Sequence, residues 1–358
     1  MLMVVGCFTA FVAAGCGDDF LVVEPRARTG VWAGVHFSCG QLDGGALHCW
    51  GDNDQHQLGV DAAELAPQPV RGLGEVTEAA LGWDHACALD LAGAVWCWGA
   101  NDLGQLGRGD AGGSTPNPEQ VLGLDDVVEI SAGRDYTCAR ERDNEILCWG
   151  RNDRGQLGRG AATPYEATPS AVLDLPAVRL VAAGRLGACA LDMTGVAWCW
   201  GHTITGLYDQ PVPFVVPGLS GPFQTMDSSF DHHCALDSDG MPWCWGEGSA
   251  SHAMAEPRAI DEVRADVVGV AHQRAYGLRD GVVSWWWCRH LDWMGGPDVV
   301  PLSGAVTSLS VGDYHACAVI GEESLWCWGA NHSGQLGDGT AEEHDEPVRV
   351  LLSAQPEP

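Results

Sequence analysis

Cysteine is the residue in this chain whose type and spacing could do the most chemistry. Six times a cysteine is followed ten positions later by another, and each second cysteine is followed by Trp-Gly. The pairs are Cys39 and Cys49, Cys87 and Cys97, Cys138 and Cys148, Cys189 and Cys199, Cys234 and Cys244, and Cys317 and Cys327. Zinc prefers four ligands in a closed tetrahedral site. Because these cysteines come as separate pairs, we expect six disulfides and no metal site.

The ten-residue interval also predicts the element that carries each pair. Leu91-Ala92-Gly93, inside the second pair, suits a three-residue hairpin loop whose last residue is left-handed. In that register each residue faces the one ten positions later. Opposed residues on antiparallel strands lie ~4.5–5.5 Å apart at Cα, within the range of a disulfide. Each pair should therefore link the two strands of one hairpin. Cys288 is left over, and we expect it to be a buried thiol.

The hairpin belongs to an internal repeat. The second cysteines are spaced by 48, 51, 51, 45 and 83 residues, and the last gap is long enough to hold a further unit. Within it, Val270–Leu278 matches Leu81–Leu89, and Tyr276 and Trp286 stand where the cysteines would be. The chain therefore contains seven units of about 41 to 51 residues.

Periods of this length with short strands indicate a β-propeller. The second unit should contain strands at Gln68–Val70, Val76–Leu81, His85–Asp90 and Ala94–Trp98. The predicted fold is all-β, a seven-bladed β-propeller with four-stranded antiparallel blades, over residues 32–352. Glu346–Leu351 repeats the opening strand, so we expect the C-terminal strand to complete the first blade and close the ring. Tryptophans beside the second cysteines should fill the space between blades.

Four units continue after Trp-Gly with a further string, at Asn53–Gly59, Asn101–Gly107, Asn152–Gly158 and Asn331–Gly337. Its form is Asn-x-x-Gly-Gln-Leu-Gly, with His56 replacing the first glycine in the first copy. Together with the cysteine strand and Trp-Gly, this string resembles the regulator-of-chromosome-condensation repeat, a family of seven-bladed propellers. We expect its glycines to take positive φ, its leucine to fill the core and its glutamine to bond loop backbone. Units four to six lack Gly-Gln-Leu-Gly, so their loops should differ.

The N-terminal segment has the features of an export signal. Its first fifteen residues are apolar and end in Val12-Ala13-Ala14-Gly15-Cys16, which resembles a bacterial lipoprotein signal. We expect residues 1–15 to be a signal peptide, Cys16 to carry a lipid, residues 16–31 to be a tether and 353–358 a tail. The alternative for the first segment is a buried apolar strand. Export would place the protein in the cell envelope, lipid-anchored and periplasmic or surface-exposed, where cysteines pair.

The charge balance excludes one class of partner. The formal net charge is −30, and all 18 positive residues are arginine. Nucleic-acid binding depends on clustered Lys and Arg that neutralise phosphates. We therefore expect no nucleic-acid partner.

One loop position varies from unit to unit while the core repeats. Four positions before each first cysteine, or before Tyr276, stand Val35, Trp83, Arg134, Arg185, Phe230, His272 and Asp313, with Asp84, Asp135, Asp231 and Tyr314 beside them. Varied aromatic, Arg and Asp side chains on a rigid face are hot-spot chemistry for a protein partner. We predict that all of these except Val35 form a binding surface. The alternative is that they are ordinary exposed loop residues.

The remaining histidine and aspartate candidates give little support for catalysis or calcium binding. His85, His232 and His315 stand two residues before a cysteine, and as repeat members they fit hydrogen bonding within the blades better than catalysis. Asp52-Asn53-Asp54 lacks the glycine and the distal glutamate of a calcium-binding EF-hand loop. We expect no catalytic residue, no metal and no cofactor.

These observations favour a non-catalytic, membrane-anchored scaffold that binds a protein partner through the loops of one propeller face, as a monomer. Blades are scaffold, and function in such folds is carried by loops. A glycan-binding propeller is the main alternative, because exposed Trp, Tyr and Asp also suit sugars. A propeller lyase is a further alternative. Guanine-nucleotide exchange, which the resemblance also implies, would require a GTPase that an exported lipoprotein does not meet.

Overall fold

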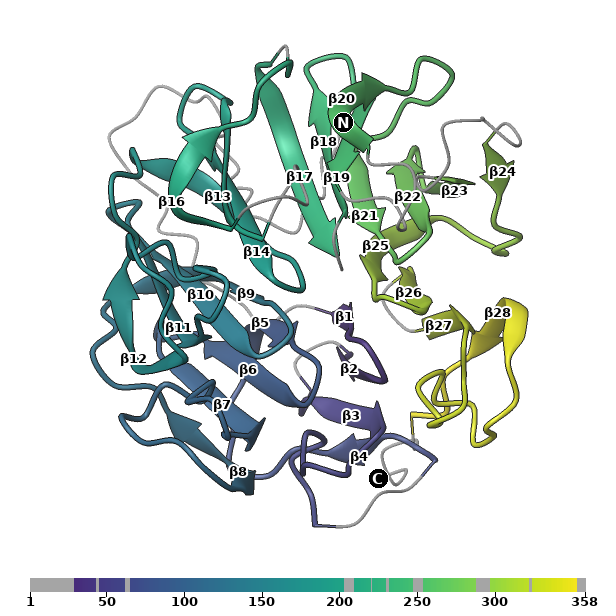
Figure 1. Ribbon diagram of the computed structural model, residues 1–358. Helices are drawn as coiled ribbons and strands as arrows, with labels where there is room; N and C mark the ends of the chain where they lie inside the picture. The colour runs from purple at the N-terminus through teal and green to yellow at the C-terminus, as the bar shows by residue number, and fades with distance from the viewer. Residues whose placement is uncertain are drawn as a thin grey trace, which may run out of the picture.

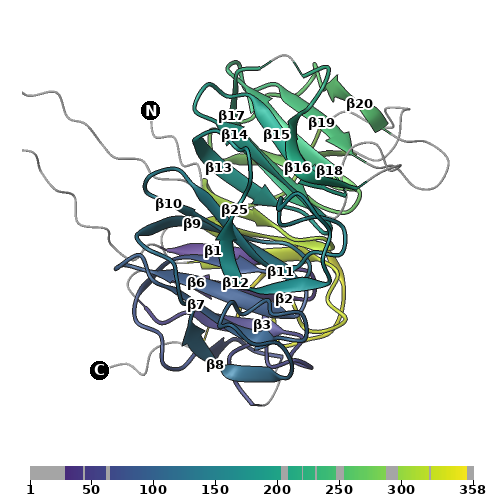
Figure 2. The ribbon, with the colours of Figure 1, turned by 60° about the vertical axis from the view of Figure 1, so that its left-hand side comes forward.

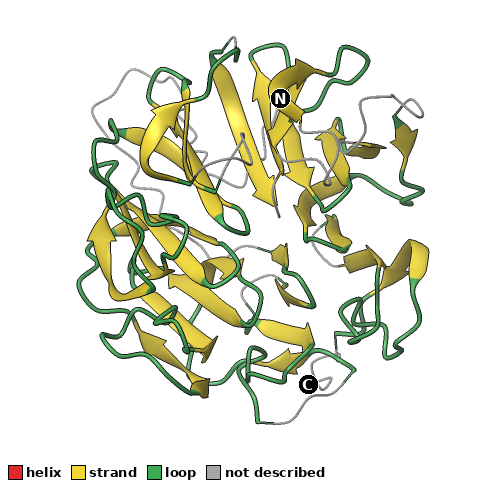
Figure 3. Cartoon of the chain, viewed as in Figure 1, coloured by secondary structure: helices red, strands yellow, loops and turns green. Residues whose placement is uncertain are grey.

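The computed structural model describes residues 29–42, 45–61, 65–202, 209–219, 221–229, 232–246, 254–287, 297–321 and 324–352. These residues form 28 strands in seven four-stranded antiparallel sheets, and no helix occurs among them. The sheets are arranged as blades around a common axis (Figures 1 and 3). The predicted all-β, seven-bladed propeller is confirmed. Within the described ranges no helix could span a membrane.

Each blade contains four consecutive strands. Blade 1 consists of β1 (Gly30–Ala33), β2 (Phe37–Gln41), β3 (His48–Gly51) and β4 (Gln68–Pro69), and blade 2 of β5 (Val76–Leu81), β6 (His85–Asp90), β7 (Val95–Ala100) and β8 (Ser114–Gln120). Blade 3 consists of β9 (Val127–Ala132), β10 (Tyr136–Glu141), β11 (Ile146–Arg151) and β12 (Tyr165–Ala171), and blade 4 of β13 (Val178–Ala183), β14 (Gly187–Asp192), β15 (Ala197–Gly201) and β16 (Gln210–Val215).

The remaining blades follow the same order. Blade 5 consists of β17 (Phe223–Ser229), β18 (His232–Asp237), β19 (Pro242–Gly246) and β20 (Met254–Ala259), and blade 6 of β21 (Val267–Val270), β22 (Arg274–Arg279), β23 (Val282–Trp287) and β24 (Asp298–Val299). Blade 7 consists of β25 (Val306–Val311), β26 (His315–Ile320), β27 (Ser324–Gly329) and β28 (His344–Arg349). The first strand of each blade is the innermost, and the turned view in Figure 2 shows blade 2 beside blade 3.

The second and third strands of a blade form the predicted hairpin. In blade 2, Cys87 faces Cys97 in the register. Gly93 closes the turn by donating its backbone N–H to the Asp90 carbonyl at 3.1 Å, with a φ of +82°. The left-handed conformation costs glycine little because it has no Cβ, and this explains why the loop needs it at its third position.

All six predicted cysteine pairs are disulfides within single blades. Their S–S distances lie between 2.01 and 2.12 Å and their Cα–Cα distances between 4.0 and 4.1 Å. Every one of these cysteines is buried. In chain order the bonds join Cys39 to Cys49, Cys87 to Cys97, Cys138 to Cys148, Cys189 to Cys199, Cys234 to Cys244 and Cys317 to Cys327. A loop of this length stabilises the fold by about 2–3 kcal/mol per disulfide, through restriction of the unfolded chain.

Blade 6 departs from the predicted register. Tyr276 occupies the first vacant cysteine position, as expected, because it faces Gly269 as Cys87 faces Ala80. The second position is occupied by Trp285, which faces Tyr276, whereas Trp286 faces Ala275, so the expectation for Trp286 is wrong. The cause is a shorter turn, because Asp280 and Gly281 form a two-residue connection with φ of +52° and +76°. Two consecutive left-handed residues are typical of a type I′ hairpin.

The prediction that the C-terminal strand completes the first blade is also wrong. β28 pairs with β27 inside blade 7, and β4 already occupies the outer edge of β3 in blade 1. Gln68 and Pro69, expected to open the second unit, therefore close the first blade. In every described blade the fourth strand pairs with the free edge of the third strand that precedes it in the sequence. Each blade is therefore formed by one continuous stretch of the chain. β1 starts at Gly30 and supplies the innermost strand of blade 1.

Tryptophans pack the spaces between blades. The residue after each second cysteine is fully or almost fully buried, as in Trp50, Trp98, Trp149, Trp200, Trp245 and Trp328. The tryptophan before the cysteine is half-buried, and in blade 2 the Trp96 indole N–H donates to the Asp90 carboxylate at 2.9 Å. Both sets of rings add apolar area where two flat sheets meet.

Candidate binding face and axial cavity

Two sets of loops gather on one face of the propeller. Because the strands of a blade alternate in direction, the turn between its first and second strands lies on the same side as the loop between its third and fourth. Backbone hydrogen bonds join the two sets, for example from Ala100 N to Asp84 O at 2.8 Å and from Arg151 N to Asp135 O at 2.9 Å. We call this side the loop face.

The Asn-x-x-Gly-Gln-Leu-Gly string forms a self-bonded loop between the third and fourth strands of blades 1, 2, 3 and 7. In blade 2 the Leu106 N–H donates to Asn101 Oδ1 at 3.1 Å and the Leu103 N–H to Gln105 Oε1 at 2.8 Å. Leu106 is 1% exposed, so the leucine fills the core as expected. Gly104 has a φ of +72°, and His56 takes the same conformation, at +64°, where the first copy lacks the glycine.

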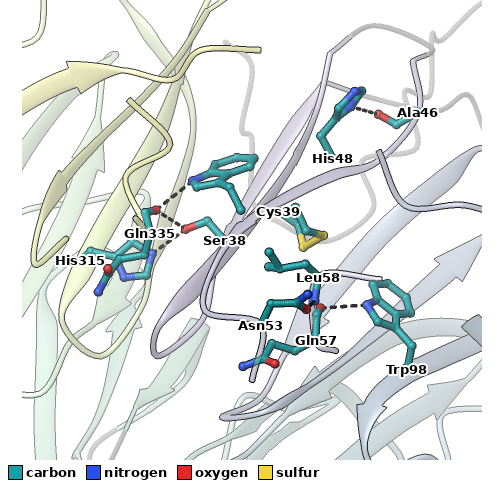
Figure 4. Close-up of a disulfide and its surroundings, with 12 residues drawn as sticks. Ser38, Cys39, Ala46, His48, Asn53, Gln57, Leu58, Trp98, His315 and Gln335 are labelled. Atoms are coloured by element: carbon teal, nitrogen blue, oxygen red, sulfur yellow. Dashed lines mark hydrogen bonds between the residues drawn. A yellow bond between two sulfur atoms is a disulfide. The ribbon is translucent and has the colours of Figure 1, made fainter. Parts of the chain in front are cut away.

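The same loops join neighbouring blades. The indole N–H of Trp98 in blade 2 donates to the Gln57 carbonyl of blade 1 at 2.9 Å. The equivalent bonds are Trp149 to Gln105 at 2.9 Å, Trp200 to Gln156 at 2.8 Å and Trp50 to Gln335 at 2.8 Å. The last of these joins blade 7 to blade 1 and so helps to close the ring. Figure 4 shows the Gln57–Trp98 bond beside the first disulfide.

The buried histidines are further joints between blades. His85 Nε2 lies 2.9 Å from Thr137 Oγ1 of the next blade, and His315 Nε2 lies 2.6 Å from Ser38 Oγ across the blade 7–blade 1 boundary (Figure 4). Burial lowers the pKa of His85 to about 4 and that of His315 to about 3. Both rings are therefore neutral near pH 7 and act as hydrogen-bonding groups. His232 is buried at the equivalent position of blade 5.

One histidine–serine pair has the geometry of a nucleophile and a base. His233 Nδ1 lies 2.8 Å from Ser228 Oγ and 3.5 Å from Cys189 Sγ. His233 stands one residue before a cysteine, as Ser38 and Thr137 do, and each of those two hydroxyls is hydrogen-bonded to a histidine of the preceding blade. In the blade that precedes His233, Gly187 takes the place of that histidine. His233 therefore provides the polar contact at this blade boundary, but from the following blade instead of the preceding one. Burial lowers its pKa to about 3, which makes it a poor base at neutral pH.

The structure brings most of the predicted ring residues to the mouth of one cavity. Val35, Trp83, Arg134, Arg185 and Asp313 line an axial cavity of about 190 Å³, and Asp84, Asp135 and Tyr314 lie next to them in the same turns. His272, in the equivalent turn of blade 6, donates its backbone N–H to the Asp313 carbonyl at 2.9 Å. Phe230 and Asp231 lie outside the described residues, as do Cys16 and Cys288.

Flat side chains follow one another around this mouth. The Arg134 guanidinium lies 3.9 Å and that of Arg185 5.7 Å from the Trp83 ring centroid. Trp83 meets the His36 ring edge-on at 6.0 Å, and Tyr314 stacks on His36 at 5.7 Å and contacts His272 at 5.7 Å. These six side chains, from blades 6, 7, 1, 2, 3 and 4, are called the mouth arc below. His36 was missed by the sequence prediction, although it stands beside Val35 as Asp84 stands beside Trp83.

Carboxylates crowd the face outside the mouth arc. Burial raises the pKa of Asp84 to about 6, with added repulsion from Asp52 and Asp135, while the Arg134 charge opposes the rise. Burial also raises the pKa of Asp135, although Arg134 Nε and Arg151 Nη1 lie 3.3 and 3.2 Å from its Oδ2. A partner that brings positive charge to this region would relieve the repulsion.

The innermost strands and their turns form the cavity wall, and among the described strands none pairs with the inward edges of these strands. Polar side chains bond these edges across blades: Val270 N donates to Asp227 Oδ2 at 2.7 Å, Ala183 N to Ser131 Oγ and Ala33 N to Ser310 Oγ, both at 2.9 Å. Asp227, Ser228, Ser229 and Ser310 line the cavity. The sequence prediction missed them, although Ser131, Asp227 and Ser310 each stand seven residues before a first cysteine.

Metal binding finds no support in the part of the chain that the structure describes. No group of three or more His, Cys, Asp or Glu side chains there is arranged to hold an ion. Asp52 is half-buried and Asp54 is exposed, both in a loop, and the Asp54 backbone N–H donates to Asp52 Oδ1 at 3.2 Å.

A family model described as the regulator of chromosome condensation (RCC1) repeat matches residues 44–89, 92–140, 143–191 and 322–356. A second model of the same repeat matches residues 76–105, 127–156 and 306–335. The matched segments cover the repeats that carry Asn-x-x-Gly-Gln-Leu-Gly.

Similar proteins include the ultraviolet-B receptor UVR8 of Arabidopsis thaliana, which is 27% identical over 373 residues, 94% of this chain and 84% of the receptor. The probable E3 ubiquitin-protein ligase HERC6 of Homo sapiens is 34% identical over 168 residues, which cover 45% of this chain and 16% of the ligase. The chain thus spans only a small part of that ligase.

Solved structures show the same fold at low identity. Prp20p of Saccharomyces cerevisiae has a TM-score of 0.72 at 19% identity, with 91% of this chain and 88% of that one covered. The ectodomain of the Arabidopsis thaliana receptor kinase ACR4 has a TM-score of 0.52 at 18% identity, covering 82% and 90% of the two chains.

Proposed function

Since the chain belongs to the regulator of chromosome condensation (RCC1) repeat family, we propose that it is a non-catalytic scaffold that binds a protein partner through its loop face. The observation that carries the proposal is the mouth arc, in which Trp83, Arg134 and Tyr314 stand on three different blades. Tyr, Trp and Arg are the residues most enriched among binding hot spots. Tyr314 is 40% exposed, so the arc presents an aromatic surface to solvent.

The scaffold supports such a face by its rigidity. Each of six blades carries a buried disulfide, and four blade boundaries carry the Trp–Gln bond. A partner that docks on pre-organised side chains loses little conformational entropy in fixing them. The carboxylates around Asp84 favour a partner with a basic surface, since complementary potentials speed encounter.

The proposal includes export and a lipid anchor on Cys16, with the protein held in the cell envelope as a monomer. Six disulfides support it, because such bonds persist in oxidising compartments. Peptide mapping without reductant should find the six local pairs in protein isolated from cells, and radiolabelled palmitate should mark wild type but not Cys16→Ser. Free thiols at the twelve paired positions would contradict export.

The binding face is tested by capture from an envelope extract. Trp83→Ala combined with Tyr314→Ala should weaken capture by about tenfold or more, because each hot-spot truncation costs at least about 1–2 kcal/mol. Leu122→Ala is the control, since this side chain is 65% exposed and follows the end of β8, away from the loop face. Equal capture by the double variant and the control would show that the partner binds elsewhere.

A glycan is the second candidate, favoured by the exposed Tyr314 ring with carboxylates nearby. A glycan array probed with the same two proteins separates the candidates. Saturable binding to one glycan class, lost in the Trp83→Ala/Tyr314→Ala variant, would replace the protein partner by a sugar.

A further inference from the structure

The axial cavity is large enough for a small molecule. Its volume is about 190 Å³, and an engineered protein cavity of about 150 Å³ accommodates benzene. The innermost strands and the turns of the loop face form its wall. A ligand in it would be surrounded by side chains from several blades, and these side chains define its chemistry.

One side of the cavity is cationic. Arg134 and Arg185, on the neighbouring blades 3 and 4, both line it, and both guanidiniums gather over the Trp83 ring. Arg134 also pairs with Asp135 at 3.3 Å. A guanidinium has five N–H donors in a planar fork that matches a carboxylate, so one such contact leaves Arg134 able to bind another.

The wall that blades 5 and 7 contribute carries two carboxyl groups. Asp227 of blade 5 and Asp313 of blade 7 line the cavity, and the two carboxylates lie close enough for the charge of Asp313 to oppose ionisation of Asp227. Ser229 Oγ donates to Asp313, and Val270 N donates to one oxygen of Asp227 at 2.7 Å. The Ser228 and Ser229 hydroxyls belong to the same wall.

The guanidiniums come from blades 3 and 4 and the carboxyl groups from blades 5 and 7, and this division decides between ligand classes. The two guanidiniums would repel a ligand that carries only positive charge, and the two carboxylates would repel a ligand that carries only negative charge. A charge removed from water must be paired to avoid a large desolvation cost. A ligand that carries both charges can pair with the guanidiniums and with the carboxyl groups at once. Because its net charge is zero, the net charge of −30 on the chain neither attracts nor repels it.

We propose that the axial cavity binds a free zwitterion of α-amino-acid size, with its carboxylate toward Arg134 and Arg185 and its ammonium toward Asp227 and Asp313. The site opens at the mouth of the ring and shares Trp83, Arg134 and Arg185 with the partner surface of the proposed function. Asp227 and Asp313, in contrast, belong to the cavity and not to the mouth arc.

The test is isothermal titration calorimetry of the full chain at pH 8, above the pKa of about 7 that burial gives Asp227, with each of the twenty L-amino acids. At least one should bind with a Kd below about 1 mM. The best ligand is then compared with its methyl ester, which has lost the negative charge, and its N-acetyl derivative, which has lost the positive charge. Each derivative should bind at least about tenfold more weakly, since each leaves one pair of charged side chains unsatisfied.

Two variants locate the site. Asp227→Asn keeps an oxygen that can accept from Val270 N and removes the charge, and Arg185→Gln removes one of the two guanidiniums. Both should weaken the best amino acid by about tenfold, with circular dichroism and melting temperature recording that they fold. Arg108→Gln, in a loop where Arg108 pairs with Asp110 and Glu119, is the control and should bind as wild type.

Three results would overturn the proposal: no amino acid binding at about 10 mM, equal binding of the singly charged derivatives, or equal binding by both cavity variants. None of these three results tests the proposed protein partner, because capture from the envelope extract is measured separately. Loss of capture in Trp83→Ala/Tyr314→Ala with no amino acid bound would leave the proposed function standing and remove the cavity ligand.

Discussion

Two arcs of the ring have the same blades but different joints. Blades 7, 1, 2 and 3 carry the Asn-x-x-Gly-Gln-Leu-Gly loop, and we call them the latched arc, because each loop binds the tryptophan of the next blade. Blades 4, 5 and 6 form the divergent arc. There, Trp245 and Trp286 are as deeply buried as Trp98, yet their indole N–H groups have no hydrogen-bond partner among the residues that the structure describes.

The difference separates what builds a blade from what joins blades. Disulfides, hairpins and buried tryptophans occur in both arcs, so the blade depends on its own residues. The Trp–Gln bond is an addition at the boundary, and the last glycine of the string permits it: a Cβ on Gly107 would lie 2.7 Å from Trp149 Nε1. The ring closes between blades 7 and 1, inside the latched arc, where Trp50 binds Gln335.

The sharpest test concerns the blade without a disulfide. Tyr276→Cys with Trp285→Cys should form a disulfide in almost every molecule, because these residues face each other in blade 6 as Cys87 and Cys97 do in blade 2. Mass spectrometry after alkylation without reductant measures it. Tyr276→Cys with Trp286→Cys is the control and should keep both thiols. A disulfide in the control alone would restore the ten-residue register.

The next largest effect concerns the leucine of the latched loops. Leu106→Ala should lower the free energy of unfolding by about 2–5 kcal/mol, because a buried leucine loses both its transfer free energy and its packing. Denaturation in guanidinium chloride, with the disulfides intact, measures the loss. Leu122→Ala, on an exposed side chain, should change stability by less than about 0.5 kcal/mol. A loss as small as the control's would mean that the loops do not hold the latched arc together.

A smaller difference measures the latch itself. Trp98→Phe and Trp245→Phe remove a similar volume from two fully buried sites, but only Trp98→Phe leaves a carbonyl, that of Gln57, without its donor. Trp98→Phe should therefore cost about 1 kcal/mol more. Equal free energies of unfolding for the two variants would show that the indole bond contributes nothing beyond packing.

A further difference is a pH dependence at one register position of the divergent arc. Ser131 of blade 3 and Ser310 of blade 7 stand in the register position that Asp227 has in blade 5. Burial raises the pKa of Asp227 to about 7, with added repulsion from Asp313. The folded state thus binds more protons than the unfolded chain, whose Asp pKa is about 3.9, and Asp227 lowers stability as pH rises from about 4 to about 7.

Asp227→Ser removes this titration. The stability of the variant relative to wild type should therefore increase between about pH 4 and pH 8, as measured by urea denaturation at each pH. Ser131→Ala, at the matching position of the latched arc, should show a constant difference. A constant difference for Asp227→Ser as well would mean that the carboxylate does not titrate in this window.

Much of the fold followed from local spacing. The ten-residue interval predicted the hairpin register of six blades, since a three-residue loop admits only one pairing of Cys87 with Cys97. The same reasoning was wrong for blade 6, because the two-residue turn at Asp280 and Gly281 shifts the partner of Tyr276 to Trp285. It also assigned Gln68–Val70 to the wrong blade, since a strand's position in the sequence does not say which free edge it will pair with.

The candidate site was predicted in part. The repeat placed Trp83, Arg134, Arg185 and Asp313 at equivalent turns, and equivalent turns of a closed ring meet at its axis. His36 and Asp227 were missed because their roles depend on neighbours from other blades. Tyr314 lies against His36 only because the ring brings blade 7 back to blade 1.

The amino-acid sequence alone determined the number of blades, the pairing of their cysteines and the identity of the latched loops, because each of these depends on residues a few positions apart within one repeat. The tertiary structure decided how the ring closes and which polar and charged side chains line the axis. These features arise between blades, where contacting residues are about forty or more positions apart: Trp98 and Gln57 are separated by 41 positions, and Ser38 and His315 by 277. Their meeting depends on the curvature of the whole ring, which no single repeat contains.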